Sequence, residues 1–161
     1  MISIKMTGQV KVLTLLEKLR KIDKVVRLWL ESSEVDNIMN DSFSKNFRSQ
    51  GRPKWTSLAS STKSTRVSKG FGASPILHET GNLMDEVTSM RGKVSSASGG
   101  FVKEWGADQL RGTERKKFVA HQGGIGKPGQ KLPQRQMIGF QKEDASKLTR
   151  SLSNWLSTQI Q

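Results

Sequence analysis

Apolar residues recur every three or four positions through the first third of the chain, and polar residues fill the intervals. The apolar series is Val12, Leu15, Leu16, Leu19, Ile22, Val26, Trp29, Leu30, Val35, Met39, Phe43 and Phe47. This spacing places them on one face of a helix. We therefore predict helix over residues 9–48, with a break near Asp23, which can cap the start of a second helix. Gly51-Arg52-Pro53 ends the region, because proline has no amide hydrogen and disfavours helix at the residue before it.

Strand signals occur at three further places. Residues 2–6 alternate apolar and polar side chains, and residues 135–140 form another strand candidate. Val94 and residues 101–105 flank the Ser- and Gly-rich stretch 95–100, which predicts a β-hairpin with a flexible tip. These segments predict a small, mostly antiparallel sheet.

The middle of the chain predicts short helices separated by loops. Thr80-Gly81 leads into a helical turn that carries Leu83, and residues 108–121 are weakly helical. Residues 123–129 contain four glycines and a proline, so they form a loop. The Ser/Thr-rich stretch 57–74 is expected to be part short helix and part flexible loop.

Asp144 can cap a final amphipathic helix. Its apolar face, which we expect to pack on the core, comprises Ala145, Leu148, Leu152, Trp155, Leu156 and Ile160. The order of elements predicts an α+β fold, in which N-terminal helices and the C-terminal amphipathic helix pack on the small sheet and long basic loops connect them. At 161 residues the chain is expected to form a single domain, 1–161.

Basic residues outnumber acidic ones, 27 against 14, which gives a formal net charge of +13. This excess predicts a polyanion or an acidic protein surface as a neighbour. Residues 42–78 and residues 115–142 contain no Asp or Glu, and each stretch carries seven basic residues. Solubility alone would explain one such block about equally well. Two blocks on an otherwise nearly neutral chain favour a surface with a dedicated partner.

Several protein classes are excluded by composition. The chain has no cysteine, so it forms no disulfide, thiolate zinc site or cysteine nucleophile. No apolar run approaches the ~18 residues of a membrane span. Residues 1–13 interleave apolar and polar side chains, unlike a signal peptide. We expect a protein that is made in the cytoplasm and has no membrane partner.

The candidate chemical motifs are weak. His78 and His121 supply the two imidazoles, and asparagine stands at position 82, where a metalloprotease helix would place its second histidine. Residues 123–127 lack the spacing and the terminal Ser or Thr of a phosphate-binding loop. The sequence therefore predicts no metal and no cofactor.

Paired carboxylates and tryptophans also have plain structural interpretations. Glu104 and Asp108 share the spacing of one helix face, but charge balance for Arg111 and Arg115 explains them better than catalysis does. Trp55 lies in the first basic block and is the candidate for an exposed base-stacking tryptophan. Even there, anchoring of the loop to the core is the favoured role. We expect no catalytic residues.

Four short segments between residues 53 and 140 carry a set of motifs in order. They are Pro-x-Trp-x-x-Leu with a following Thr and Thr-Arg, Ile-Leu-x-x-Thr-Gly-x-Leu, His-Gln before two glycines, and apolar-Pro-x-Arg-x-apolar-apolar-Gly. The motif positions are Pro53, Trp55, Leu58, Thr80, Gly81, Leu83, His121, Gln122, Gly124, Pro133, Arg135 and Gly139. This set resembles the phage virion-morphogenesis family, the tail-completion or neck proteins of Mu-like tailed bacteriophages. The chain departs from the family in lacking an aromatic residue after Gln122, in having Phe118 where a Tyr-Ala pair is usual, and in having Gln136 for a common proline.

The resemblance implies a structural virion protein of the bacteriophage neck, without catalysis, that completes the tail and joins head to tail. It implies a homo-oligomer, a hexameric ring around the DNA channel, made in the host cytoplasm and located in the virion. Its implied neighbours are tail-tube or terminator proteins and head-connector proteins. For the motif residues themselves, we favour maintenance of the fold over direct contact with a partner.

In such a ring the basic residues are expected to face the channel, where they can contact packaged DNA without reading its sequence, or an adjoining ring. The candidates are Arg48, Arg52, Lys54, Lys63, Arg66, Lys116, Lys117, Lys127 and Lys131. The alternative hypothesis is a sequence-independent nucleic-acid-binding protein, in which the two basic blocks hold phosphates. An enzyme, namely a nuclease, ranks third.

Overall fold

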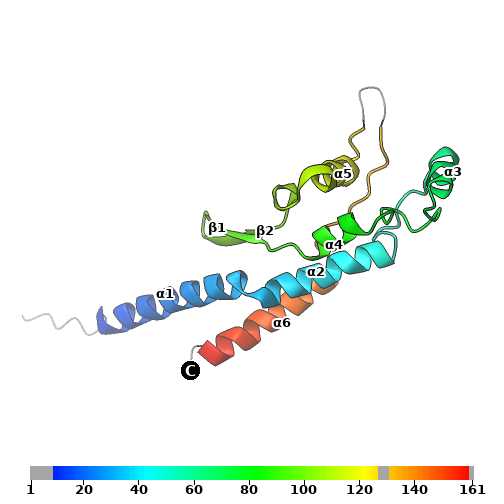
Figure 1. The fold of residues 1–161 in the computed structure, drawn as a ribbon. Coiled ribbons are helices and arrows are strands. Elements are labelled where there is room, and N and C mark those ends of the chain that lie inside the picture. Colours follow the sequence, from blue (N-terminus) through cyan, green and yellow to red (C-terminus); the bar gives the residue numbers. More distant parts are fainter. Residues whose placement is uncertain (1–8, 127–130, 160–161) are drawn as a thin grey trace, which may run out of the picture.

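Three long helices form one side of the computed structural model, which describes residues 9–126 and 131–159 (Figure 1). Helix α1 spans Gln9–Glu31, α2 spans Ser33–Arg48, and α6, Lys142–Gln159, runs antiparallel to α2 and contacts both. The other elements are α3 Ser60–Ser68, α4 Asn82–Thr88, β1 Lys93–Ala97, β2 Gly100–Glu104, the 3-10 helix Ala107–Gln109 and α5 Gly112–Gly123. Helices α4 and α5 and the hairpin lie across α2 from α6, and α3 lies at the end of the domain away from residue 159. The predicted α+β fold is confirmed.

The N-terminal helical region is broken at Ser32, so the predicted break at Asp23 is wrong. Asp23 lies exposed inside α1, and the buried residues Val25 and Trp29 follow it. The backbone of Ser32 is extended, and its hydroxyl donates a 2.6 Å hydrogen bond to the Trp29 carbonyl. Such a bond competes with the helical ladder, whereas one exposed aspartate costs a helix only ~0.5 kcal/mol.

Helix α2 ends in front of Gly51-Arg52-Pro53, as predicted. Gly51 has φ +99°, and a Cβ there would lie 2.5 Å from the Pro53 carbonyl oxygen. Its amide donates to the Asn46 carbonyl at 2.7 Å. Glycine is required here because other residues rarely adopt this φ.

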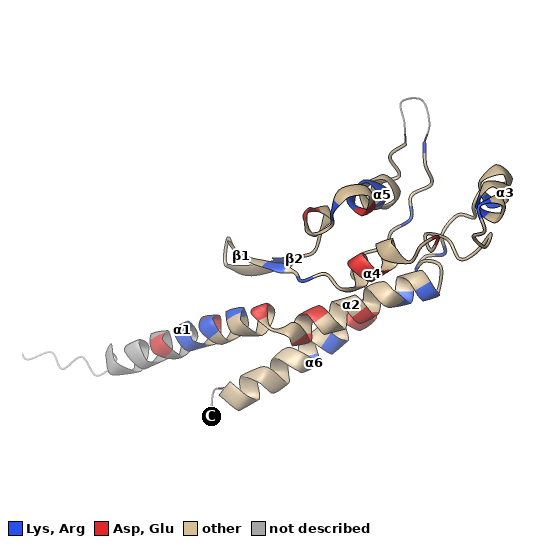
Figure 2. Ribbon diagram, viewed as in Figure 1, with Lys and Arg blue, Asp and Glu red and all other residues tan. Residues whose placement is uncertain are grey.

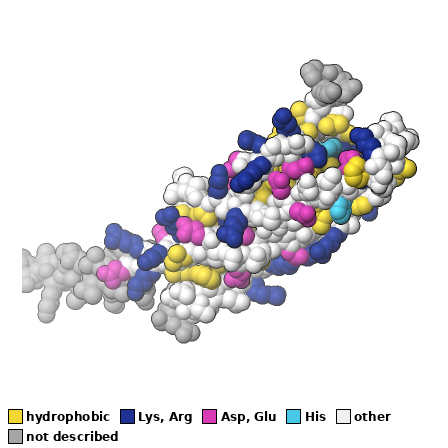
Figure 3. Space-filling model, in the orientation of Figure 1, with side chains coloured by type: hydrophobic (Ala, Val, Ile, Leu, Met, Phe, Trp, Pro, Cys, Tyr) yellow, Lys and Arg dark blue, Asp and Glu magenta, His cyan; other side chains and the backbone are white. Residues whose placement is uncertain are grey.

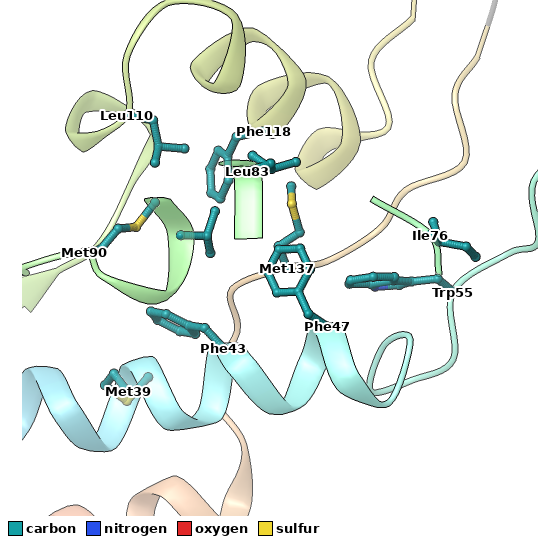
Figure 4. Close-up of a cluster of buried hydrophobic side chains, with 11 residues drawn as sticks. Met39, Phe43, Phe47, Trp55, Ile76, Leu83, Met90, Leu110, Phe118 and Met137 are labelled. Carbon is teal, nitrogen blue, oxygen red and sulfur yellow. The ribbon is translucent and has the colours of Figure 1, made fainter. Parts of the chain in front are cut away.

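The hydrophobic core fills the space between α2 and the elements opposite α6 (Figure 4). Its members are Met39, Phe43, Phe47, Trp55, Ile76, Leu83, Val87, Met90, Leu110, Phe118 and Met137. The rings of Phe47 and Trp55 meet edge to face, with centroids 5.6 Å apart. Full burial of one such side chain contributes ~1.5–3 kcal/mol, so this cluster holds segments from most of the chain together.

The predicted β-hairpin is confirmed, with a tighter turn than predicted. Lys93 pairs with Glu104 and Ala97 with Gly100, so only residues 98–99 form the turn. Asp36 of α2 anchors the hairpin. One of its carboxylate oxygens accepts hydrogen bonds from the Gly92 amide at 2.9 Å and from Trp105 Nε1 at 3.2 Å, and lies 2.8 Å from Lys103 Nζ.

Residues 135–140 do not form the predicted strand. The backbone of residues 136–138 forms its hydrogen bonds with side chains and not with a neighbouring strand. The side-chain oxygen of Gln122 accepts hydrogen bonds from the backbone N–H groups of Met137 and Ile138 at 2.7 and 3.2 Å. Its side-chain nitrogen donates to the Ile138 carbonyl at 2.9 Å. Asn46 donates to the Met137 carbonyl at 2.8 Å. Within residues 9–126 and 131–159, the sheet therefore has two strands. The strand predicted at residues 2–6 lies outside the described residues.

The final helix begins at Lys142, two residues before the predicted cap. Asp144 lies in its first turn, where its carboxylate accepts from the Gln141 amide at 2.9 Å and from Ser42 Oγ at 2.7 Å. Its apolar face packs on the core less than predicted. Leu148 packs against the core cluster, but Leu152 and Trp155 are half-buried and lie outside it.

Candidate functional site between helices α3, α4 and α5

All four motif segments meet beside helix α5. Trp55 of the first segment is buried, with 6% of its surface exposed, and its Nε1 donates to the Gln136 carbonyl of the fourth segment at 3.2 Å. The predicted anchoring of this loop to the core is thereby confirmed. Gln122 of the third segment binds the fourth through the three hydrogen bonds described above.

Arg135 ties the first, third and fourth segments together. Its side chain is buried, and its backbone amide donates to the His121 carbonyl at 2.7 Å. One guanidinium nitrogen lies 3.2 Å from His121 Nδ1, and another donates to the Thr56 carbonyl at 3.2 Å. Because a guanidinium can only donate, Nδ1 of His121 is the acceptor in this pair.

His121 is neutral at physiological pH. Its burial, together with the charges of Arg135 and Lys117, lowers the pKa of the imidazole from 6.5 to about 4. Burial also lowers the pKa of the Arg135 guanidinium. The neutral imidazole therefore fits its role as an acceptor for Arg135.

The second motif segment is held to α3 by Arg66. This side chain is 7% exposed, and its guanidinium donates to the carbonyls of Pro75 at 3.1 Å and His78 at 3.3 Å. Leu77, between these two carbonyls, has φ +60°, which is rare for a residue other than glycine. Gly81, with φ +86°, is the residue directly before α4. Arg66 therefore holds a bent loop in place and does not face solvent.

A cavity of about 200 Å³ lies between these elements. It is lined by Leu58, Thr62, Arg66, Leu77, Glu79, Thr80, Gly81, Leu83, Lys117 and His121. Eight of these residues come from the first two motif segments, and every motif segment except the fourth contributes directly. This is the region of the surface in which histidine, basic and apolar side chains gather at the α3 end of the domain (Figure 3).

The motif residues differ in how far they are buried. Trp55, Leu83 and Arg135 are buried, Leu58, Gly81, His121, Gln122, Gly124 and Gly139 are half-buried, and Pro53, Thr80 and Pro133 are exposed. Sequence reasoning missed Asn46 and Asp36, although both are buried and lie within the apolar spacing of α2. A polar residue inside an apolar helical stripe was the signal that could have identified them.

The basic candidates fall into three groups. Arg66 is buried, Arg52 is paired with Glu143, and Lys117 is paired with Glu114 at 2.9 Å. The exposed candidates, with no described carboxylate within 4.0 Å, are Arg48, Lys54, Lys63, Lys116 and Lys131. Figure 2 shows basic residues at the end of α2, on α3 and on α5. Lys127 lies outside the described residues.

Residues 104 and 108 do not share a helix face, since one lies in β2 and the other in the 3-10 helix. Glu104 is exposed on β2, and Asp108 is paired with Lys93, not with Arg111 or Arg115 as predicted. The hydrogen bond from Lys93 lowers the pKa of Asp108. Within residues 9–126 and 131–159, no group of three or more His, Asp or Glu side chains could hold a metal ion. None of the helices described there is long and apolar enough to cross a membrane.

Comparison with known proteins gives one match. The model of a family described as the phage virion morphogenesis family matches residues 11–157. No curated protein and no solved structure matches the chain. The matched range includes all four motif segments and every helix from α2 to α5.

Proposed function

The chain belongs to the phage virion morphogenesis family, and from this premise we propose that it is a neck subunit that completes the tail and joins head to tail as an oligomeric ring around the DNA channel. The family is one of virion structure and assembly, so the chain is a bacteriophage virion component. Family membership alone does not give the position in the neck or the ring, and these two points are what we propose. The observation that supports them is the group of unpaired cations at the α3 end of the domain.

These cations form a surface suited to a polyanion. Lys54, Lys63 and Lys116 come from a loop, α3 and α5, and all are exposed. Some cations elsewhere lie in ion pairs, as Lys45 and Lys147 do with Asp41, both at 3.1 Å. A closed ring of identical subunits repeats one surface around its axis. Charges repeated in this way raise the potential of a lumen, which suits the passage of DNA.

The helical side of the domain offers a surface for contact between copies. Leu28 of α1 is 46% exposed, and Leu152 and Trp155 of α6 are half-buried. Leu28 directly precedes the buried Trp29 in the sequence. Accessible apolar side chains of this kind favour contact with another protein surface. We therefore place the subunit contacts on α1 and α6 and the channel contacts at the α3 end.

Deletion of the gene from the phage or prophage that carries it tests the proposal. Full heads and complete tails should accumulate unjoined, and expression of the wild-type chain should restore joined particles in electron micrographs. Light scattering of the purified chain should show an oligomer. Normally joined virions in the absence of the protein would contradict the neck assignment.

The exposed cations also support a second candidate, a sequence-independent DNA-binding protein. A chain that stays monomeric, binds duplex DNA tightly and is absent from purified virions would favour this function. Its affinity would then fall with salt at a slope of about −0.9 per phosphate neutralised.

A further inference from the structure

The lining of the cavity between α3, α4 and α5 is of two chemical kinds. Leu58, Leu77 and Leu83 supply an apolar wall. The polar lining includes the hydroxyls of Thr62 and Thr80 and the cations Arg66 and Lys117. The cavity volume of about 200 Å³ is below the ~300–1,000 Å³ of pockets for drug-sized ligands, so it suits a smaller group.

Arg66 is a buried cation without a carboxylate partner. Within the described part of the chain, its guanidinium bonds only to two carbonyls, and its buried Nε has no hydrogen-bond partner. Burying a charge is costly unless the charge is paired. Neutral carbonyls meet only part of this requirement, so an anion near Arg66 would be strongly favoured.

The carboxylates near the cavity do not pair with Arg66. Lys117 pairs with Glu114 at 2.9 Å. Glu79 lines the cavity and Asp85 lies beside Gly81, but both are exposed, and neither forms an ion pair with Arg66 within 4.0 Å. Arg66 is therefore the buried cation of this site with which a bound anion would pair.

We propose that this cavity binds a carboxylate carried on a short apolar stem and supplied by a partner protein. The apolar wall would hold the stem, and Arg66, Lys117 and the two threonine hydroxyls would bind the carboxylate. An acidic side chain and a chain terminus present this same chemistry. A DNA phosphate is disfavoured because the three lining leucines suit an aliphatic stem and not a sugar-phosphate backbone.

The test is an NMR titration of the isolated chain with small probes. N-acetyl-leucine represents a chain terminus, N-acetyl-glutamate α-amide represents an acidic side chain, and N-acetyl-leucinamide is the uncharged control. At least one acid should shift the amide signals of Thr62, Gly81 and His121, and the amide control should bind about tenfold more weakly or not at all. Preference for one acid identifies the source of the natural carboxylate.

Matched variants locate the binding. Lys117→Gln and Thr62→Val should each weaken the acid by about tenfold, whereas Lys116→Gln, an exposed neighbour outside the cavity, should not. Equal binding of acid and amide, tighter binding of inorganic phosphate than of either acid, or no binding would each overturn the proposal. The titration uses the isolated chain, so its failure would leave the neck assignment untouched, and failure of the gene deletion would leave the cavity untouched.

Discussion

The fold holds His121 neutral over most of the pH range, and this makes stability depend on pH. The pKa of His121 is about 4 in the folded state, against 6.5 in the unfolded state. Between these values the unfolded state binds the proton and the folded state does not. Stability that is fully present above pH 6.5 should therefore be lost as the pH falls toward 4.

This pH dependence can be measured by urea unfolding at a series of pH values. The free energy of unfolding should fall from pH 7 to pH 4.5 with a slope approaching one proton. His121→Asn keeps an acceptor for Arg135 but does not titrate, so it should flatten the slope. His78→Asn, at the other, exposed histidine, should not. An unchanged slope in His121→Asn would show that other groups are responsible.

Gln122 is the residue whose loss should most disturb the 136–138 segment. Gln122→Leu would leave two backbone amides and one carbonyl without their partners. We expect a loss of about 2–4 kcal/mol in the free energy of unfolding, because each buried unsatisfied group costs ~1–3 kcal/mol. Gln136→Leu, at a nearby exposed position, is the control and should change stability little. Equal effects of the two substitutions would contradict the role given to Gln122.

Helix α6 has a smaller part in the core than its sequence pattern predicts. Trp155→Ala and Leu152→Ala are expected to lower the free energy of unfolding by ~1–2 kcal/mol, against ~3–5 kcal/mol for Phe43→Ala, which empties a fully buried position. Thermal unfolding measures the contribution of this helix to the stability of the subunit, and light scattering measures its contribution to contact between subunits. The exposed Asn154→Ala is the control for both. Unchanged stability with loss of the oligomer would assign α6 entirely to the subunit contact.

The Ser/Thr-rich stretch 57–74 remains predicted to be mobile outside the assembly. Its helix α3 buries only Arg66, so little apolar area offsets the entropy of ordering. In the isolated subunit α3 should be folded most of the time but open locally more often than α2, so that its hydrogen exchange is faster than that of α2. Contact with a neighbour should slow exchange in α3. Strong protection of α3 amides in the monomer would contradict this expectation.

Elements with a repeated local pattern could be predicted, and those held by distant side chains could not. The helical spacing of Met39, Phe43 and Phe47 predicted α2, and the Ser- and Gly-rich stretch 95–100 between Val94 and residues 101–105 predicted the hairpin. Residues 135–140 were wrongly predicted as a strand because their partners, Gln122 and Asn46, are side chains from other elements. For the site, the motif residues were found, but not the cavity, since no spacing along the chain shows that Arg66 lies near Lys117.

At the scale of the whole molecule, the unpaired cations should govern any interaction with DNA. The double variant Lys54→Glu/Lys116→Glu should reduce both affinity for duplex DNA and its salt dependence, by about 0.9 in slope for each lost phosphate contact. Arg91→Glu/Arg150→Glu makes the same change in net charge at exposed positions outside both basic blocks. Binding assays across ~50–200 mM salt compare the two. Identical losses would indicate a nonspecific effect of net charge.

Because α3 and the end of α6 lie at opposite ends of the domain (Figure 1), the two ends can be labelled independently. A fluorophore fused to the C-terminus would report on a particle from the end of the domain away from α3. The chain has no native cysteine, and Lys63→Cys would therefore take a single thiol-reactive dye at the α3 end. Energy transfer between these two labels in one subunit, and between subunits that carry one label each, would measure the orientation of the domain within an assembled particle.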